Sequence, residues 1–135
     1  MTAQVGKAMR LKRVIDPVGV SIICALDHGM TSPTFLEPLA DIVKTNWPGD
    51  PESFGKLVEA ANGIPVVLAG GSRLEDEELL WRMQVAVEAG AIGCSVGRNI
   101  FMHASPEAIT RALSRVIRER WSAEKAHDAL VEELG

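Results

Sequence analysis

Apolar residues recur every three or four positions in four segments of the chain, which is the period of an amphipathic helix. The last of these segments covers about residues 122–134. We therefore expect four helices that each pack one face against a core. The apolar positions are Phe54, Leu57, Val58 and Ala61; Leu79, Leu80, Met83, Ala86 and Val87; Ile109, Ala112, Leu113, Val116 and Ile117; and Ala123, Ala126, Leu130 and Leu134.

The ends of the predicted helices carry recognisable signals. Asp50-Pro51 and Ser105-Pro106 each combine an N-cap side chain with a proline at the first helical position. A glycine that adopts a left-handed conformation commonly ends a helix. The glycines at such positions are Gly63 and Gly90.

Four apolar runs are too short for helices and lack polar alternation, which is typical of parallel strands that are covered on both faces. They are residues 20–26, 40–45, 64–69 and 91–96. From residue 40 onward strands and helices alternate, which predicts an α/β fold with a parallel sheet and right-handed crossovers. A parallel crossover generally needs about ten or more residues with a helix, and residues 34–39 could form little more than one helical turn, so the connection over residues 30–39 is unusually short.

Composition indicates a folded protein and narrows the classes of function. Of the 135 residues, 47% are hydrophobic and 24% are charged, with a formal net charge of -4. This charge does not favour nucleic acid or an anionic membrane as a partner, and no apolar run is long enough for a membrane span. We read the basic cluster of residues 7–13 as a solvated arm. Cys24 and Cys94 are expected to be core residues in a reducing cytoplasm, and they offer no zinc site.

Polar or glycine-rich residues lie at the end of each predicted strand. They are Asp27-His28-Gly29, Lys44-Thr45-Asn46, Gly70-Gly71-Ser72 and Gly97-Arg98-Asn99. The carboxyl ends of parallel strands lie at one edge of a sheet, and active sites of α/β proteins form there. The four groups are therefore expected to lie along one rim.

Lys44 is the strongest candidate for covalent chemistry. Burial in an apolar barrel disfavours an ammonium ion, and the neutral amine of a lysine can attack a carbonyl group and form an imine. The alternative is a lysine that extends from a strand end into solvent. Trp47, three residues later, either packs in the core or borders the site.

Two glycine-containing loops are candidates for an anion site. Backbone N–H groups at Gly70, Gly71, Ser72 and Gly97 can turn toward a phosphate, and Arg98 can add a charge-assisted contact. The alternative is that these glycines serve tight turns only.

Other polar residues give weaker signals. Asp27 and His28 could transfer protons or could form a structural pair. We read His103 and His127 as surface or helix-packing residues.

The motifs "VKT", "AGG" and "VGRNIF", in this order and spacing, resemble the closing third of the DhnA-type class I aldolases. That family includes archaeal-type fructose-1,6-bisphosphate aldolase, 2-amino-3,7-dideoxy-heptulosonate synthase and autoinducer-2 phosphate thiolase. The segments "GKAMRLKRVI" and "ALDHGM" resemble its opening. The resemblance covers residues 6–29 and 40 to about 120.

The resemblance implies roles for particular residues. Lys44 would be the Schiff-base lysine of the sixth barrel strand, and Asp27 the acid at the end of the first strand. Gly71, Ser72, Gly97 and Arg98 would hold the substrate phosphate. No metal or cofactor is implied, because the protonated imine accepts the electrons.

The chain departs from the family pattern in length. Aldolase barrels have eight strands and about 250 residues, whereas here Asp27-His28-Gly29 is followed almost directly by the strand of Lys44. Strands two to five are expected to be missing, together with a tyrosine that the family uses for proton transfer, and the chain contains no tyrosine. We therefore expect a truncated (β/α)8 TIM barrel, with about four parallel strands in the order six-seven-eight-one and outer helices.

Such a half-barrel would form a single domain over residues 1–135. It would consist of a first-strand segment (1–39), strands six to eight with their helices (40–121) and a C-terminal helix (122–135). It would expose two strand edges and an apolar inner face, and would let water reach Lys44, so we expect a homo-oligomer.

Three functions remain open. The first is a cytoplasmic class I aldolase-family lyase that acts on a phosphorylated ketose similar to fructose 1,6-bisphosphate. The second is a half-barrel that binds sugar phosphates or self-assembles without turnover. The third is the same fold with acyl-transfer or condensation chemistry.

Overall fold

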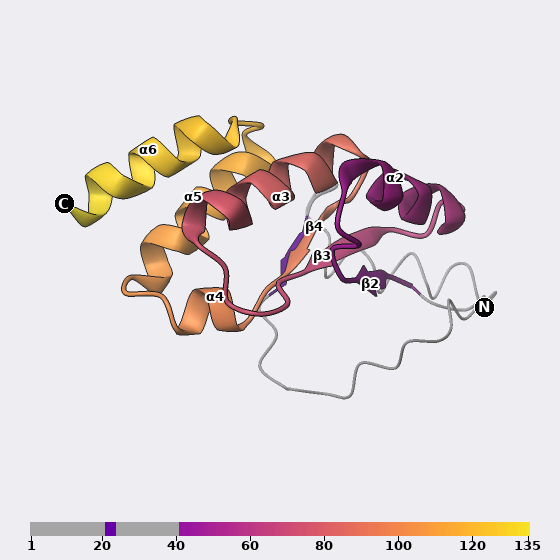
Figure 1. Ribbon diagram of the computed structural model, residues 1–135, viewed down its shortest axis with the longest axis horizontal. Helices are drawn as coiled ribbons and strands as arrows, with labels where there is room; N and C mark the ends of the chain where they lie inside the picture. The colour runs from indigo at the N-terminus through magenta and orange to yellow at the C-terminus, as the bar shows by residue number, and fades with distance from the viewer. Residues whose placement is uncertain (1–20, 24–40) are drawn as a thin grey trace, which may run out of the picture.

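The computed structural model describes residues 21–23 and 41–135, which form a parallel sheet with helices packed on one side (Figure 1). The sheet has four strands in the order β1-β4-β3-β2. They are β1 (Ser21–Ile23), β2 (Val43–Thr45), β3 (Val66–Ala69) and β4 (Gly93–Ser95). Each lies within one of the four apolar runs in the sequence, so the predicted α/β class is confirmed.

The pairing of β1 with β4 confirms the predicted barrel order. Ser21 is in register with Gly93, and Ile23 with Ser95. Strands β2, β3 and β4 follow one another across the sheet, as strands six, seven and eight of a barrel would, and β1 then adds to β4 as a first strand would. The described strands are therefore a contiguous part of a barrel wall.

Five helices accompany these strands in the described residues. They are α2 (Pro51–Ala60), α3 (Asp76–Glu88), α4 (Arg98–Phe101), α5 (Pro106–Arg118) and α6 (Ala123–Leu134). The four that the apolar periodicity predicts are present. The sequence did not predict α4, because a helix of four residues is too short to show a repeated apolar spacing.

The predicted N-caps of α2 and α5 are confirmed. The Asp50 side chain accepts a hydrogen bond from the Ser53 backbone N–H at 2.8 Å, and Ser105 accepts one from Ala108 at 3.3 Å. Helix α3 ends at Glu88, and Gly90, two residues later, has a φ of 106°, in the left-handed region. After α2, this conformation begins one residue before the predicted glycine, at Asn62 with φ 48°.

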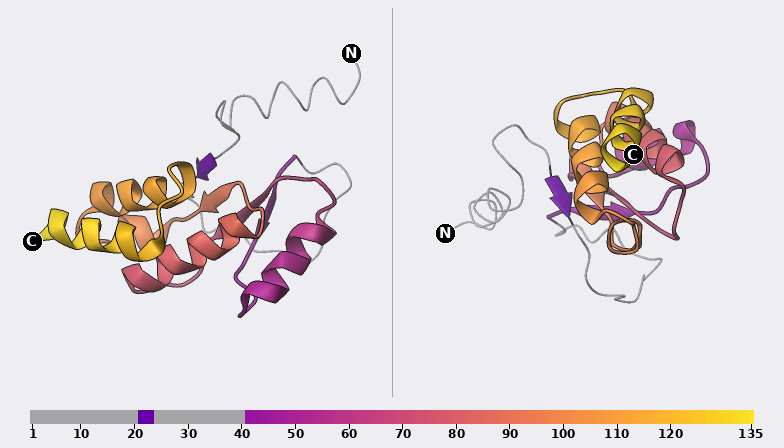
Figure 2. Two further views of the ribbon diagram at one scale, coloured as in Figure 1. Left: turned by 90° about the horizontal axis from the view of Figure 1, so that it is seen from above. Right: turned by 90° about the vertical axis from the view of Figure 1, so that its left-hand side faces the viewer.

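The core lies between the sheet and the layer of helices α3, α5 and α6, which contact one another (Figure 2). Its largest fully buried side chains from the helices are Phe54, Leu80, Met83, Ile109, Leu113, Ile117 and Leu130. Val66, Leu68 and Cys94 contribute from the strands. Two residues of the predicted stripes, Leu57 and Leu134, are exposed instead, at 38% and 45%. None of the described helices is long and apolar enough to cross a membrane.

The opposite face of the sheet is less open than expected. Val67 alternates with the core residues Val66 and Leu68, so its side chain lies on the face away from the helices. It is nevertheless only 1% exposed. The expectation of a bare apolar inner face is therefore wrong at this central position.

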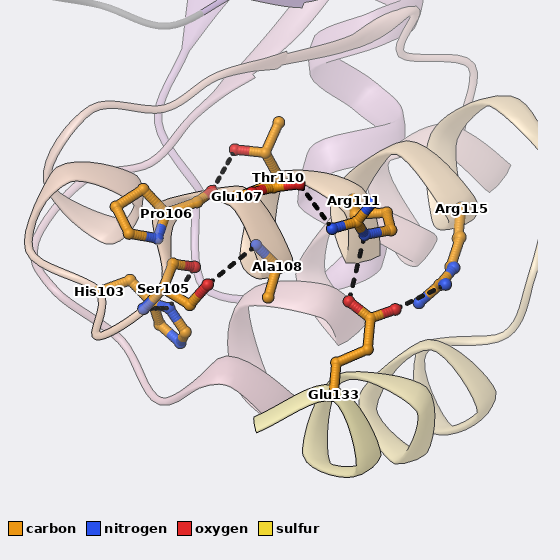
Figure 3. Close-up of polar contacts among 9 residues, drawn as sticks. All are labelled: His103, Ser105, Pro106, Glu107, Ala108, Thr110, Arg111, Arg115 and Glu133. Atoms are coloured by element: carbon orange, nitrogen blue, oxygen red, sulfur yellow. Dashed lines mark hydrogen bonds and ion pairs between the residues drawn. The ribbon is translucent and has the colours of Figure 1, made fainter. Parts of the chain in front are cut away.

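Helix α6 is fastened to α5 by a group of ion pairs (Figure 3). Glu133 of α6 pairs with Arg111 at 3.1 Å and with Arg115 at 2.7 Å, and Arg111 also pairs with Glu107 at 2.9 Å. The hydrogen bond from Arg115 holds the pKa of Glu133 below its ordinary value. A further bond ties α6 to α3, because the backbone N–H of Ala123 donates to Gln84 at 2.7 Å.

Candidate functional site

The C-terminal ends of β2, β3 and β4 lie at one edge of the sheet, since all three strands are parallel and in register. Thr45 is paired with Leu68, and Ala69 with Ser95. Lys44 therefore lies next to the end of β2, and the loops that begin at Gly70 and Gly97 leave the sheet at the same edge. The structure thus brings together the lysine and both predicted anion-binding loops.

Lys44 projects from the face of the sheet that the helices do not cover. Its neighbour Val43 packs against the core, and alternate residues of a strand point to opposite faces. Lys44 is in register with Val67 on this same face, which corresponds to the inner face of a barrel. The Lys44 side chain is exposed, as expected for a half-barrel that lets water reach it.

The loop after β3 has little freedom at its first glycine. A Cβ atom at Gly70 would lie 2.8 Å from Cγ1 of Val96 and 3.2 Å from its Cα, so a side chain does not fit there. Gly71 has φ 63°, in the left-handed region where glycine is favoured. Glycine is thus required at position 70 by the close approach of Val96, and it is favoured at position 71 by the left-handed backbone conformation.

Arg98 and Asn99 connect the loop after β4 to the loop after β3. The Arg98 guanidinium donates to the Gly71 carbonyl at 3.0 Å. The Asn99 side chain donates to the carbonyls of Gly70 at 3.0 Å and Ser72 at 3.1 Å, and accepts from the Leu74 N–H at 2.7 Å. Asn99 is only 4% exposed, whereas Arg98 is exposed and can turn toward a ligand.

Sequence reasoning placed Asn99 at the end of a strand but gave it no role. Its partners lie 25 to 29 positions away, and no local pattern indicates contacts over that separation. The sequence signal that could have indicated a role for Asn99 is its position directly before the apolar residue Ile100. Both residues are buried in α4.

Trp47 packs within the helical layer. Its ring stacks on Phe54 at 5.8 Å between centroids and meets Trp81 edge-on at 5.6 Å, and the Arg82 guanidinium lies 5.7 Å from its centroid. These contacts give the ring a packing role, which is the alternative that the sequence left open.

The remaining candidate residues fall into two groups. Asp27 and His28 lie outside the described residues. His103 has a partner that the sequence did not suggest, because its Nε2 lies 3.0 Å from Asp76 at the start of α3. That imidazole is largely buried, which agrees with a packing role.

A hollow of about 890 Å³ between α3 and α6 lies in the helical layer. Its acidic lining residues are Glu75, Glu77, Glu78, Glu124 and Asp128. Like charges repel, so a phosphorylated compound is a poor fit for this hollow. Within the described ranges, His, Cys, Asp and Glu form no group of three that could hold a metal ion.

Comparison with known proteins identifies relatives of this chain. A family model described as DeoC/LacD family aldolase matches residues 34–103. The chain is 42% identical over 87 residues to 2-amino-3,7-dideoxy-D-threo-hept-6-ulosonate synthase of Halobacterium salinarum, covering 64% of this chain and 32% of that protein. It is 36% identical over 91 residues to the class 1 fructose-bisphosphate aldolase of the same organism, covering 67% and 35%.

Solved structures give the same result. An archaeal fructose 1,6-bisphosphate aldolase matches with a TM-score of 0.56 and 34% identity, over 58% of this chain and 31% of that chain. Fructose-bisphosphate aldolase from Slackia heliotrinireducens matches with a TM-score of 0.60 and 28% identity, over 70% and 32%. The chain thus spans about one third of the length of these relatives. It belongs to the DeoC/LacD aldolase family and corresponds to part of a DhnA-type class I aldolase barrel.

Proposed function

We propose that this protein is a class I aldolase-family lyase that acts on a phosphorylated ketose through an imine at Lys44. The observation that carries the proposal is the position of Lys44, on the inner face of the barrel wall and at the same edge as the loops of Gly70 and Gly97. Relatives named fructose-bisphosphate aldolase, among them one described as Schiff-base-forming, support this choice of substrate class.

In the proposed reaction the Lys44 amine adds to the ketone carbonyl, and the carbinolamine loses water to give a protonated imine. A base removes the proton of the hydroxyl group on the β carbon of the imine, and the bond between the α and β carbons breaks. An aldehyde leaves, and the bonding electrons form an enamine on Lys44. Protonation of the enamine carbon and hydrolysis release the second product and the free lysine. We assign the base to Asp27, with His28 beside it.

The substrate phosphate is proposed to bind at Gly70, Gly71, Ser72, Gly97 and Arg98. Backbone N–H groups and a guanidinium suit an anion that remains unchanged through the reaction. The protonated imine serves as the electron acceptor, so the proposal requires no metal or cofactor. We place the reaction in the cytoplasm and expect copies of the chain to associate.

A second candidate is a half-barrel that binds sugar phosphates without turnover. The exposure of the Lys44 side chain favours it, because imine chemistry is helped by a site that excludes water. The lack of tyrosine in the chain also favours it, since the resemblance assigns a proton transfer to that residue. Both candidates share the anion site and differ only at Lys44.

Reductive trapping separates them. The protein is incubated with dihydroxyacetone phosphate and sodium borohydride, and the modified peptide is identified by mass spectrometry. We expect slow labelling of Lys44, because the amine is exposed to water. Labelling of another lysine, such as Lys56 or Lys125, would contradict the site assignment. Complete absence of adduct while phosphate still binds would favour the non-catalytic half-barrel.

A further inference from the structure

The amide of Asn99 uses both of its N–H donors and its oxygen within the loop after β3. Its two donors meet the carbonyls of Gly70 and Ser72, and its oxygen meets the N–H of Leu74. Only one orientation of the amide satisfies this set, because a flipped amide would place its oxygen against two carbonyls. A residue that is 4% exposed and bonded in this way cannot itself contact a ligand in solvent.

These bonds determine the direction of the loop N–H groups. In a trans peptide unit the C=O and the following N–H point in opposite directions, and the described residues contain no cis peptide. Asn99 holds the carbonyls of Gly70 and Ser72, and Arg98 holds that of Gly71. The N–H groups of Gly71 and Arg73, which follow the two carbonyls held by Asn99, therefore point away from Asn99.

We propose that Asn99 is the positioning residue of the phosphate site. It sets the affinity for phosphate by orienting the N–H groups of the loop, and it touches neither the anion nor the imine. This inference rests on the proposed function, because it assigns a role within the same site. Its consequence is a preference for phosphorylated over unphosphorylated carbonyl compounds that depends on Asn99.

Titration of the 15N-labelled protein with inorganic phosphate tests the inference. In Asn99→Asp a carboxylate oxygen replaces the amide nitrogen and repels the carbonyls of Gly70 and Ser72. We expect phosphate affinity at the loop amides to fall about tenfold or more, which corresponds to the loss of one or two hydrogen bonds. Asn62→Asp is the matched control, since it adds the same charge at an exposed position after α2 and should bind as the wild type does.

A second variant guards against misfolding of the buried aspartate. Asn99→Ala removes the three bonds without adding charge, and the amide spectrum of α5 and α6 reports whether it is folded. Equal phosphate affinity in the wild type and a folded Asn99 variant would overturn the inference, as would wild-type shifts at other amides or none. Failure of both variants to fold would also overturn it, because Asn99 would then serve the fold as a whole.

Borohydride trapping distinguishes a positioning role from a structural one. Asn99→Ala should label Lys44 with unphosphorylated dihydroxyacetone as the wild type does, and should lose the advantage of dihydroxyacetone phosphate. An equal loss with both compounds would indicate general damage and contradict the inference. If no protein is labelled, including the wild type, the lyase proposal fails, and the phosphate titration still decides the role of Asn99.

Discussion

The loops after β3 and β4 differ sharply from the end of β2, although all three lie at one edge of the sheet. The two loops are tied together by Asn99, which is buried, and by Arg98. Lys44 sits on an edge strand with its side chain exposed. The proposed anion site therefore lies within local contacts, whereas the proposed imine chemistry also depends on what surrounds the lysine. Within one barrel family, a ligand-binding site can thus depend on fewer strands of the barrel than a reactive side chain does.

The largest effect on imine formation is expected from Lys44→Arg. A guanidinium stays protonated and forms no imine, so the borohydride adduct at this position should disappear while phosphate binding at Gly71 persists. Mass spectrometry and the phosphate titration measure the two properties separately. Lys56→Arg, an exposed lysine on α2 paired with Glu52, is the control and should keep the adduct. Loss of both properties in Lys44→Arg would show that the two regions are not independent.

Leu113→Ala tests whether the loops share the stability of the helical core. Leu113 is fully buried, and its truncation is expected to lower the free energy of unfolding by about 2–5 kcal/mol in urea denaturation. If Asn99 links the loop to the core, hydrogen exchange at the Leu74 amide should accelerate by the same factor as exchange in α5. Exchange in β2 should change less, because edge strands open locally. Equal acceleration in β2 would remove the proposed difference between the regions.

Gly70→Ala is expected to act on the loops alone. The new Cβ would lie 2.8 Å from Val96 and 3.3 Å from the Asn99 amide nitrogen, so both must move. We expect a loss of about 1–3 kcal/mol in stability and weaker phosphate binding. Gly55→Ala within α2 is the matched control, because its Cβ would meet nothing within 4 Å and alanine favours a helix. A loss of stability in Gly55→Ala equal to that in Gly70→Ala would show that the close contact at Gly70 does not matter.

The smallest effect is expected at α6, which lies away from both regions. The pKa of Glu133 is lowered by Arg115, so the carboxylate contributes stability above the ordinary glutamate pKa of 4.5. That contribution is lost as the pH falls through the lowered pKa of the folded state. Unfolding measured across acid pH should show a shallower decline in Glu133→Gln than in the wild type. An unchanged slope would mean that these ion pairs do not stabilise α6.

The features that the sequence predicts are those with a local signature. The stripe from Ile109 to Ile117 predicts α5, and the cap at Ser105 places its start, because each depends only on neighbours within a turn or two. Lys44 and the glycine loops are predicted from their positions at the ends of strands. The role of Asn99 depends on partners about 25 positions away. The position of Trp47 in the helical layer depends on its contact with Trp81. Three-dimensional packing determines both contacts, and neither produces a periodic pattern in the sequence.

The pairing of β1 with β4 has a consequence for how the protein is made. Ser21 pairs with Gly93, 72 positions later in the chain. At roughly 5–20 residues per second, a ribosome needs about 4–14 seconds to synthesise that interval. The β1 strand thus leaves the ribosome well before its partner, whereas β2 and β3 pair across only 23 positions, from Val43 to Val66. Closing so long a loop costs entropy that the other strand pairs avoid, so β1 should dock last and be the strand most exposed to chaperones and proteases during synthesis.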